Sequence, residues 1–263
     1  MPHQVYNWMV YFLDYRFVVW GYVMIIDGRK VLLKSSVGSV NYNLTNKDSD
    51  KDYKYFVMPT FDDIYNGKYF SKGVVGEEVD YTVHDVRKLT HLLEKGNINF
   101  IEVLFANDME YDKSIEWLIN NRDMYSTLNV PYLYDACIGT HFQKMKLLFK
   151  GTSGTQKFVD MFGYDTKQAM CAYRMLDFIK RFVYFHFDFK KAITYEDGTK
   201  EKAILMGLKE GRYTLTQFLD LKDEALEVAR GYKDTYKQCA KRDKAVEGMA
   251  QNIKGLVLDA LRK

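Results

Sequence analysis

Three aspartates and one Gly-Ser pair have the residue types and the spacing that phosphate chemistry requires. Asp50 and Asp52 are two residues apart, so on a strand both carboxylates face the same side and can share divalent cations. Ten residues upstream, Gly38-Ser39 can form a turn whose backbone approaches a phosphate closely, because glycine has no Cβ in the way. Asp80 stands in a second strand-like segment. Together these residues predict a site that uses Mg²⁺ or Mn²⁺ to move a nucleotidyl group.

The three acids have distinct expected roles in such a site. Asp50 and Asp52 are expected to bridge two ions roughly 3.5–4 Å apart, of which one polarises the α-phosphate and steadies the leaving pyrophosphate. Asp80 is expected to hold the other ion, which lowers the pKa of an attacking hydroxyl. Asp48 and Asp50 form a second pair at the same spacing, within a more loop-like stretch. A charged loop that leads into a strand remains the alternative interpretation of Asp50 and Asp52.

Composition indicates a globular protein with long regular elements. Of the 263 residues, 47% are hydrophobic, 28% are charged and only three are proline. Cys137, Cys171 and Cys239 are far apart, which argues against a disulfide framework and against a zinc ribbon. The longest apolar run, residues 17–26, is too short to span a bilayer, and the amino terminus lacks the pattern of a signal peptide. We therefore expect a cytoplasmic protein with no membrane contact.

Charge is unevenly distributed along the chain, although the net charge is only +3. Residues 1–140 contain 14 Lys and Arg against 19 Asp and Glu, whereas residues 141–191 contain 10 Lys and Arg against 4 Asp and Glu. An acidic first part is suited to holding metal ions, and the basic segment is suited to meeting phosphate. A solvated basic helix face is the alternative interpretation of that segment.

Hydrophobic periodicity and turn signals predict the elements that position the acids. We expect strands at residues 30–37, 52–58 and 78–83, and helical segments at residues 5–13, 85–96, 99–105, 114–121, 132–149 and 166–185. Asp197-Gly198 is a turn signal that could close a β-hairpin. This order predicts an α+β fold, in which a small mixed sheet with helices over residues 1–107 precedes a mainly helical domain over residues 108–263.

Five short blocks follow one another in a recognisable order. They are GSVNYNL at 38–44, SDKD at 49–52, VDYTVHD at 79–85, KGNINFIEVL at 95–104 and GYDTKQAMCAYRML at 163–176. The ordered set resembles the predicted nucleotidyltransferases of the DNA polymerase β superfamily. The resemblance is greatest to their stand-alone bacterial and phage branch, which is associated with RNA repair.

This resemblance implies a polymerase-β-like catalytic core at residues 1–107, followed by a helical domain that binds substrate and nucleotide. Carried over by position, the implied metal ligands are Asp50, Asp52 and Asp80, the phosphate turn is Gly38 and Ser39, and the triphosphate contacts are Lys167 and Arg174. Lys167 and Arg174 are seven residues apart, so they share a helix face. Tyr42 follows the turn closely enough to contact the nucleotide, and Glu102 is expected to hold the catalytic strands through a hydrogen bond.

Three positions depart from the pattern of the resembling proteins. Asn43 replaces the glycine that usually follows the motif tyrosine, Ile98 replaces a proline, and Cys171 replaces a histidine. None of these changes removes an expected metal ligand. The change at Cys171 bears on any step that would require a histidine.

The leading hypothesis is therefore an enzyme that transfers a nucleoside monophosphate from an NTP, such as ATP, to an acceptor hydroxyl. RNA, protein and small molecules are all possible acceptors, and the basic segment favours RNA. The alternative is a non-catalytic protein that binds nucleotide or RNA on the same fold. Retention of all three acids argues against that alternative, because like charges held together are costly without a metal.

Overall fold

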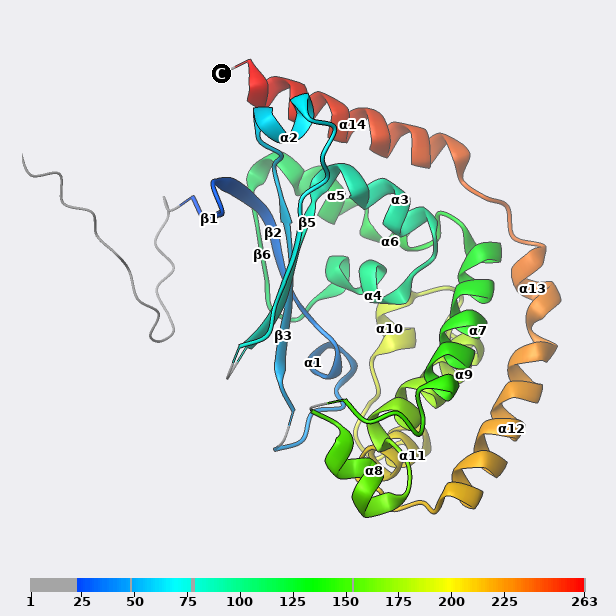
Figure 1. Ribbon diagram of the computed structural model, residues 1–263. Helices are drawn as coiled ribbons and strands as arrows, with labels where there is room; N and C mark the ends of the chain where they lie inside the picture. Colours follow the sequence, from blue (N-terminus) through cyan, green and yellow to red (C-terminus); the bar gives the residue numbers. More distant parts are fainter. Residues whose placement is uncertain (1–22, 48, 77–78, 153, 263) are drawn as a thin grey trace, which may run out of the picture.

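The computed structural model describes residues 23–47, 49–76, 79–152 and 154–262 (Figure 1). The helix expected at residues 5–13 lies outside the described residues, as does Asp48. Within these ranges, no helix is both long enough and apolar enough to cross a membrane.

One mixed sheet carries the residues of interest. The described strands are β1 Ile25–Ile26, β2 Arg29–Val37, β3 Lys51–Val57, β4 Ser71–Val74, β5 Val79–Asp85 and β6 Met109–Tyr111. Their order is β1-β2-β3-β5-β4, with β6 paired to β2. All neighbours are antiparallel except β3 and β5, which run parallel. The three predicted strands correspond to β2, β3 and β5.

The parallel pair aligns the two acidic segments. In its register Asp52 lies opposite Asp80, and Lys54 lies opposite Thr82. Residues two apart on a strand face the same side, so these four side chains share one face of the sheet. The sheet therefore brings Asp52 and Asp80 into a single patch of side chains, although 27 residues separate them along the chain.

Helices cover one face of this sheet (Figure 1). Short helical elements follow the strands: α1 Ser39–Tyr42, α2 Phe61–Tyr65, η1 Val86–Lys88, α3 Leu89–Glu94, α4 Ile98–Ile101, η2 Glu102–Phe105, η3 Lys113–Ile115, α5 Glu116–Asn120 and α6 Arg122–Ser126. Mostly longer helices form the rest: α7 Val130–Lys146, α8 Gln156–Phe162, α9 Thr166–Tyr184, α10 Phe189–Ile193, α11 Lys200–Lys209, α12 Leu215–Gly231, α13 Lys233–Lys237 and α14 Asp243–Leu261. This mixed sheet with a helical second part confirms the predicted α+β class.

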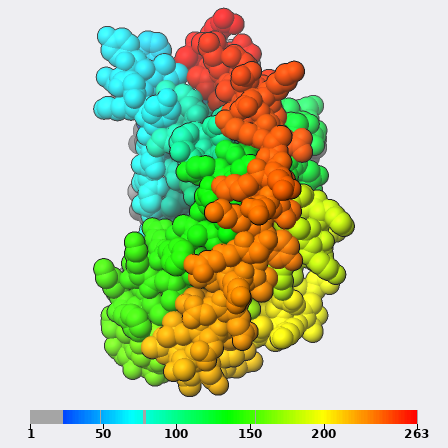
Figure 2. Space-filling model, turned by 90° about the vertical axis from the view of Figure 1, so that its right-hand side faces the viewer, coloured from blue at the N-terminus to red at the C-terminus, as the bar shows by residue number. Residues whose placement is uncertain are grey.

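Helix α9 is the centre of the helical part. Its apolar side chains include Leu176, Ile179 and Phe182, each at most 1% exposed, and α7, α11 and α12 pack around it. Asp165 begins the helix by accepting the backbone N–H of Gln168. Beyond it, α12, α13 and α14 run along one side of the molecule, and α14 returns to pack on η1 and α3 (Figure 2). The last helix thereby contacts the two helical elements that directly follow β5.

Some elements differ from the predictions. The turn at Asp197-Gly198 joins two helices rather than two strands, because Thr199 accepts the N–H of Lys202 and starts α11. The expected hairpin is therefore wrong. The sheet also continues past residue 107, since β6 pairs with Leu33 to Ser35 of β2. The two- to four-residue strands β1, β4 and β6 were not predicted, because their alternation is too short to read from sequence.

An ion pair between Arg29 of β2 and Asp63 of α2 joins that helix to the sheet. Arg29 Nε and Nη2 donate to the two carboxylate oxygens of Asp63 at 2.7 and 2.6 Å, and Asp63 also completes a capping box with Thr60. The Arg29 guanidinium holds the pKa of the Asp63 carboxyl well below its usual range. Asp63→Asn should lower the free energy of unfolding by about 2–4 kcal/mol, measured by urea denaturation at pH 7.

The control for that prediction is Asp62→Asn, because Asp62 is exposed in the same helical turn. The wild-type advantage over Asp63→Asn should shrink as the pH falls below about 4, since an acid with a depressed pKa loses its contribution on protonation. Equal stability of the two variants at pH 7 would show that the Arg29 pair contributes nothing.

Candidate active site

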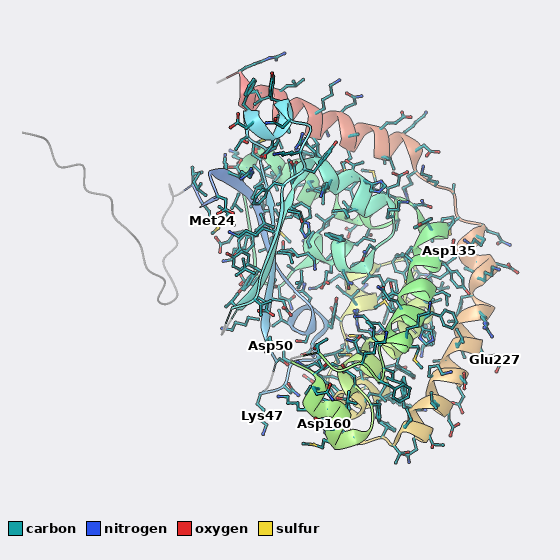
Figure 3. All side chains as sticks on the ribbon, in the orientation of Figure 1. Met24, Lys47, Asp50, Asp135, Asp160 and Glu227 are labelled. Atoms are coloured by element: carbon teal, nitrogen blue, oxygen red, sulfur yellow. The ribbon has the colours of Figure 1, made fainter. Side chains whose placement is uncertain are left out.

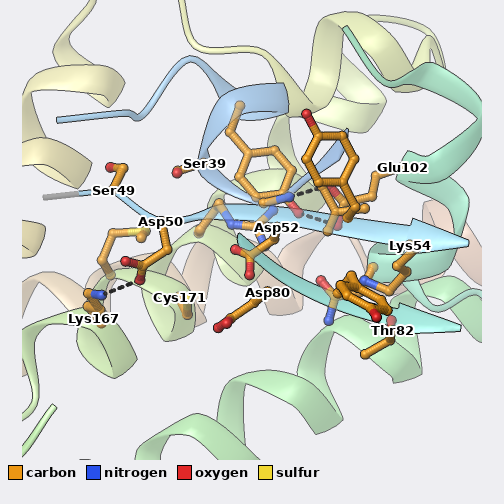
Figure 4. Close-up of a pocket in the computed structure, with 18 of the residues that line it drawn as sticks. Ser39, Ser49, Asp50, Asp52, Lys54, Asp80, Thr82, Glu102, Lys167 and Cys171 are labelled. Carbon is orange, nitrogen blue, oxygen red and sulfur yellow. Dashed lines mark hydrogen bonds and ion pairs between the residues drawn. The ribbon is translucent and has the colours of Figure 1, made fainter. Parts of the chain in front are cut away.

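A cavity of about 490 Å³ lies between the sheet, the turn after β2, and helices α7, α9 and α11 (Figure 4). Every site residue predicted from sequence lines it: Gly38, Ser39, Tyr42, Asp50, Asp52, Asp80, Lys167 and Arg174. Residues more than a hundred positions apart thus meet at one place. Their individual roles stay predictions.

The Gly38-Ser39 turn passes close to the acids. Gly38 has φ +77°, a conformation that L side chains rarely adopt, and a Cβ at this position would stand 3.4 Å from Asp52 Oδ2. Strand β2 ends here, and Ser39 begins the four-residue helix α1. Glycine is therefore favoured by the backbone conformation, whereas a Cβ here would only reach contact distance of the carboxylate.

Glu102 holds this turn in place. Its carboxylate is 1% exposed and accepts three hydrogen bonds: from Gly38 N at 3.0 Å, from Asn41 Nδ2 at 3.3 Å and from the Tyr42 hydroxyl at 2.7 Å. The expected hydrogen bond of Glu102 is thus present, and it supports the turn after β2. A buried carboxylate with several donors is a rigid support, because each lost bond would leave a buried polar group unpaired.

A second set of hydrogen bonds lies beneath the turn. The Ser36 hydroxyl donates to Asn41 Oδ1 at 3.1 Å, and Asn41 Nδ2 donates to the Ser36 carbonyl at 2.7 Å. The backbone N–H of Asn107 also donates to Asn41 Oδ1 at 3.1 Å. Ser36 and Asn41 are at most 4% exposed. This network ties the turn to the chain segment that leads into β6.

Asp52 and Asp80 lie side by side on the face of the sheet that borders the cavity (Figure 4). Burial raises the pKa of Asp52, and the negative charges of Asp80 and Asp50 raise it further. Asp80 Oδ1 accepts the backbone N–H of Gly76 at 3.1 Å. A cation bound between these carboxylates would be stabilised, because its charge would offset their mutual repulsion.

Asp50 is turned toward the helical part. Its Oδ2 lies 3.3 Å from Lys167 Nζ, at the end of the sheet that faces α8 (Figure 3). The Asp50 side chain is 65% exposed and that of Lys167 is 31% exposed, so the pair is open to solvent. Such pairs contribute little to stability and exchange partners readily.

The fit of a divalent cation to these residues is therefore partial in the geometry described. Carboxylate oxygens are the donors that Mg²⁺ and Mn²⁺ prefer, and Asp52 and Asp80 supply them in register. In the described parts of the chain, however, no three His, Cys, Asp or Glu side chains form a ready metal-binding group. The predicted third ligand, Asp50, is engaged with Lys167 instead.

Arg174 is the most unusual cation in the cavity. It is 4% exposed, its guanidinium carbon lies 3.8 Å from the centre of the Tyr42 ring, and its Nε and Nη1 atoms are buried without a hydrogen-bond partner. Tyr42 is itself 4% exposed, and its ring packs against the Arg174 guanidinium. Direct contact between Tyr42 and a nucleotide stays a prediction, since one face of its ring is covered by the guanidinium.

Lys209 of α11 is a site residue that sequence reasoning missed. It is 7% exposed, and its Nζ donates to the Leu44 carbonyl at 2.7 Å and to Ser49 Oγ at 2.8 Å. It therefore holds both ends of the segment that joins the turn to the acids. A signal was available, because Leu205, Leu208 and Lys209 form one helical stripe and the lysine falls on the buried side.

Two further polar side chains continue the same face of the sheet. Burial lowers the pKa of Lys54, against the opposing effect of Glu102 and Asp52. Burial, together with the charge of Lys54, lowers the pKa of His84 to about 4, so His84 is neutral at pH 7. His84 Nε2 lies 3.1 Å from the Thr82 hydroxyl.

The three departures noted in the sequence are accommodated by the structure. Asn43 has φ 58° and ψ 41°, and asparagine adopts this left-handed conformation more readily than most residues other than glycine. Ile98 is the first residue of α4, a position that suits proline, and its side chain is buried. Cys171 lines the cavity.

Comparison with curated proteins gives no match. The model of the RNA repair pathway DNA polymerase beta family (RlaP) matches residues 22–176, which is more than half of the chain. The matched region contains the turn, the three acids, Glu102, Lys167 and Arg174, so the predicted resemblance is confirmed and the coarse assignment as a polymerase-β-like nucleotidyltransferase is supported. The chain belongs to the RNA repair pathway DNA polymerase beta family.

Proposed function

We propose that this protein transfers a nucleoside monophosphate from an NTP to an acceptor hydroxyl and releases pyrophosphate. The observation that carries the proposal is the pairing of Asp52 with Asp80 across parallel strands, beside Gly38 and opposite the cations Lys167 and Arg174. Carboxylates that repel one another, next to a buried guanidinium with two unpartnered nitrogens and a lysine held only by a solvent-exposed pair, suit a ligand made of phosphates and divalent metal. Family membership supports the same reaction class.

The triphosphate would lie against the turn and α9. Arg174 has two buried nitrogens without a hydrogen-bond partner, and phosphate oxygens would satisfy them. Lys167 would leave Asp50 for the triphosphate, because a solvent-exposed pair is replaced at little cost. The Ser39 hydroxyl and the backbone at Gly38, which Glu102 keeps rigid, would border the same phosphates.

The chemical step would join the acceptor oxygen to the α-phosphorus and break the bond from that phosphorus to the bridging oxygen of pyrophosphate. Asp80 would orient the acceptor hydroxyl and take its proton, which then passes to solvent. Mg²⁺ or Mn²⁺, held by Asp52 and Asp80 and by Asp50 after Lys167 leaves it, would supply Lewis-acid stabilisation of the charge on the phosphates. Most of the rate enhancement would come from placement and charge neutralisation.

Isothermal titration calorimetry with each of the four NTPs, with and without Mg²⁺, tests the binding half of this proposal. We expect Mg²⁺ to strengthen binding of at least one NTP by tenfold or more, and Asp80→Asn to remove that gain. Lys167→Met should weaken Mg²⁺–NTP binding about tenfold through loss of one charge-assisted contact. Lys150→Met is the matched control, because Lys150 is exposed beyond the end of α7.

Metal-independent binding of equal strength in wild type and Asp80→Asn would contradict the proposal. That outcome would instead favour a non-catalytic nucleotide-binding protein on this fold.

A further inference from the structure

A short segment that follows α9 contacts the one-turn helix α1, which begins directly after Gly38 (Figure 1). The segment is residues 189–195, which comprise α10 and the two residues after it, and we call it the supporting segment. The Tyr195 backbone N–H donates to the Tyr42 carbonyl at 3.0 Å, and Asn43 Nδ2 donates to the Tyr195 carbonyl at 2.8 Å. The last residue of α1 and the residue that caps it are therefore both bonded to Tyr195.

A second connection reaches α1 from the other end of the supporting segment. Lys190 Nζ donates to the Phe105 carbonyl at 2.8 Å and to Asn107 Oδ1 at 2.6 Å. Asn107 Nδ2 in turn donates to the Val40 carbonyl at 3.0 Å. Two carbonyl groups of α1, those of Val40 and Tyr42, are thus held directly or through Asn107 by the same short segment.

The supporting segment is itself held firmly. Arg181 of α9 is 8% exposed, and its Nε and Nη2 donate over 2.6 to 2.9 Å to the carbonyl groups of Lys191, Ala192 and Thr194. Tyr195 is fully buried. Because a buried guanidinium that satisfies three carbonyl groups resists displacement, the segment is a rigid support for α1.

Asn43 is placed so that it can affect a bound nucleotide only through the turn. Its left-handed backbone, with φ 58° and ψ 41°, caps α1, and its half-buried side chain does not line the cavity. The supporting segment lies outside residues 22–176, which the family model matches. Family membership therefore does not account for the contact between Asn43 and Tyr195.

We propose that Asn43 is a positioning residue, through which the supporting segment holds the phosphate turn in the conformation that binds the nucleotide. This inference rests on the proposed nucleotide site. Helix α1 has only four residues, so a hold on its last turn also fixes Gly38 at its start. The same hold fixes Tyr42, whose ring packs 3.8 Å from the Arg174 guanidinium carbon. A turn that is not held would bind triphosphate for only part of the time, and the apparent affinity falls by that fraction.

Asn43→Gly tests the inference, because glycine adopts a positive φ without strain and only the side-chain bond is lost. We expect calorimetry to show about fivefold weaker Mg²⁺–NTP binding, the change that one hydrogen bond supplies. KM should rise by a similar factor while kcat stays within about twofold, since the held turn binds substrate and transition state equally. The matched control is Asn121→Gly, because exposed Asn121 caps α5 and donates to the Trp117 carbonyl at 2.7 Å outside the cavity lining.

Hydrogen exchange adds a readout that does not depend on activity. Asn43→Gly should speed exchange of the Tyr195 amide in the nucleotide-free protein, and saturating Mg²⁺–NTP should reverse that increase, because coupling between two equilibria is reciprocal. Asn121→Gly should do neither. Lys190→Met removes the second connection and should weaken Mg²⁺–NTP binding by a factor similar to that of Asn43→Gly.

Equal Mg²⁺–NTP affinity of Asn43→Gly and Asn121→Gly would overturn the inference. A lower melting temperature of Asn43→Gly without a change in affinity would also overturn it, since the contact would then be structural only. Failure of the wild type to bind any Mg²⁺–NTP would instead contradict the proposed function. In that case the exchange rates of the nucleotide-free protein would still show whether Asn43 holds the turn.

Discussion

Asp52→Asn should reduce nucleotidyl transfer by at least about a thousandfold while leaving the fold intact. The Asp52 carboxylate lies opposite Asp80 and beside the Gly38 turn, where a Cβ at Gly38 would stand 3.4 Å from Asp52 Oδ2. Asp52 therefore borders both the cation and the phosphates of the proposed reaction. Although the Asp52 carboxylate is needed for transfer, its charge should lower the free energy of unfolding of the metal-free protein. Burial and the neighbouring acids raise the pKa of Asp52, so the metal-free protein loses stability as the pH rises through that raised pKa.

Asparagine removes the unfavourable charge but keeps the side-chain shape. The melting temperature of metal-free Asp52→Asn at pH 7 should therefore equal or exceed that of the wild type, and Mg²⁺ should no longer raise it. Asp62→Asn, which removes an exposed carboxylate that does not line the cavity, serves as the charge-matched control. A large drop in melting temperature for Asp52→Asn would show that the carboxylate is structural, and the account of its repulsion by Asp80 would be wrong.

Glu102→Ala should damage both stability and activity. Removal of its carboxylate would leave Gly38 N–H, the Asn41 amide and the Tyr42 hydroxyl without their shared acceptor inside the protein. We expect a loss of about 3–5 kcal/mol in the free energy of unfolding and about a hundredfold loss of transfer, because the phosphate turn would no longer be held. Urea denaturation and a transfer assay with labelled NTP measure the two effects.

Glu102→Gln separates positioning from charge. Glutamine keeps one acceptor oxygen, and the Tyr42 hydroxyl can turn to accept from its amide, so this variant should recover more than half of the lost stability. Its activity should recover in parallel, since the proposed role of Glu102 is to position the turn. Glu110→Ala is the control, because Glu110 is an exposed acid of β6 paired with Lys34. Full stability with lost activity in Glu102→Ala would instead place Glu102 in direct contact with the reacting groups.

The site could be predicted from sequence to the extent that its residues form local patterns. Asp50-x-Asp52 and the Gly38-Ser39 pair indicate their chemistry through residue type and short spacing, although Asp50 lies just before β3 and not within it. Lys167 and Arg174 could be assigned to one helix face by their separation of seven. The pairing of Asp50 with Lys167 could not be predicted, because a contact over 117 positions depends on how the helical part closes over the sheet.

In the fold, too, the elements with long local patterns could be predicted and the others could not. Strands β2 and β5 and helix α9 are long and periodic, and their boundaries were predicted within a few residues. Asp85 was expected to begin a helix, and it does accept the N–H of Arg87, but the first turn is 3₁₀ before α3 starts. The hairpin expected at Asp197-Gly198 failed because a turn signal does not specify the elements on either side of it. There the cap at Thr199 selects a helix.

The most direct test of nucleotidyl transfer uses two labels on the same nucleotide. The protein is incubated with Mg²⁺, a 3′-hydroxyl oligonucleotide and NTP labelled at either the α- or the γ-phosphate, with Asp52→Asn alongside. The account predicts that α-label enters the oligonucleotide, that γ-label appears only in pyrophosphate, and that both products disappear with Asp52→Asn. Entry of γ-label into the oligonucleotide, or α-label transfer that survives Asp52→Asn, would contradict it.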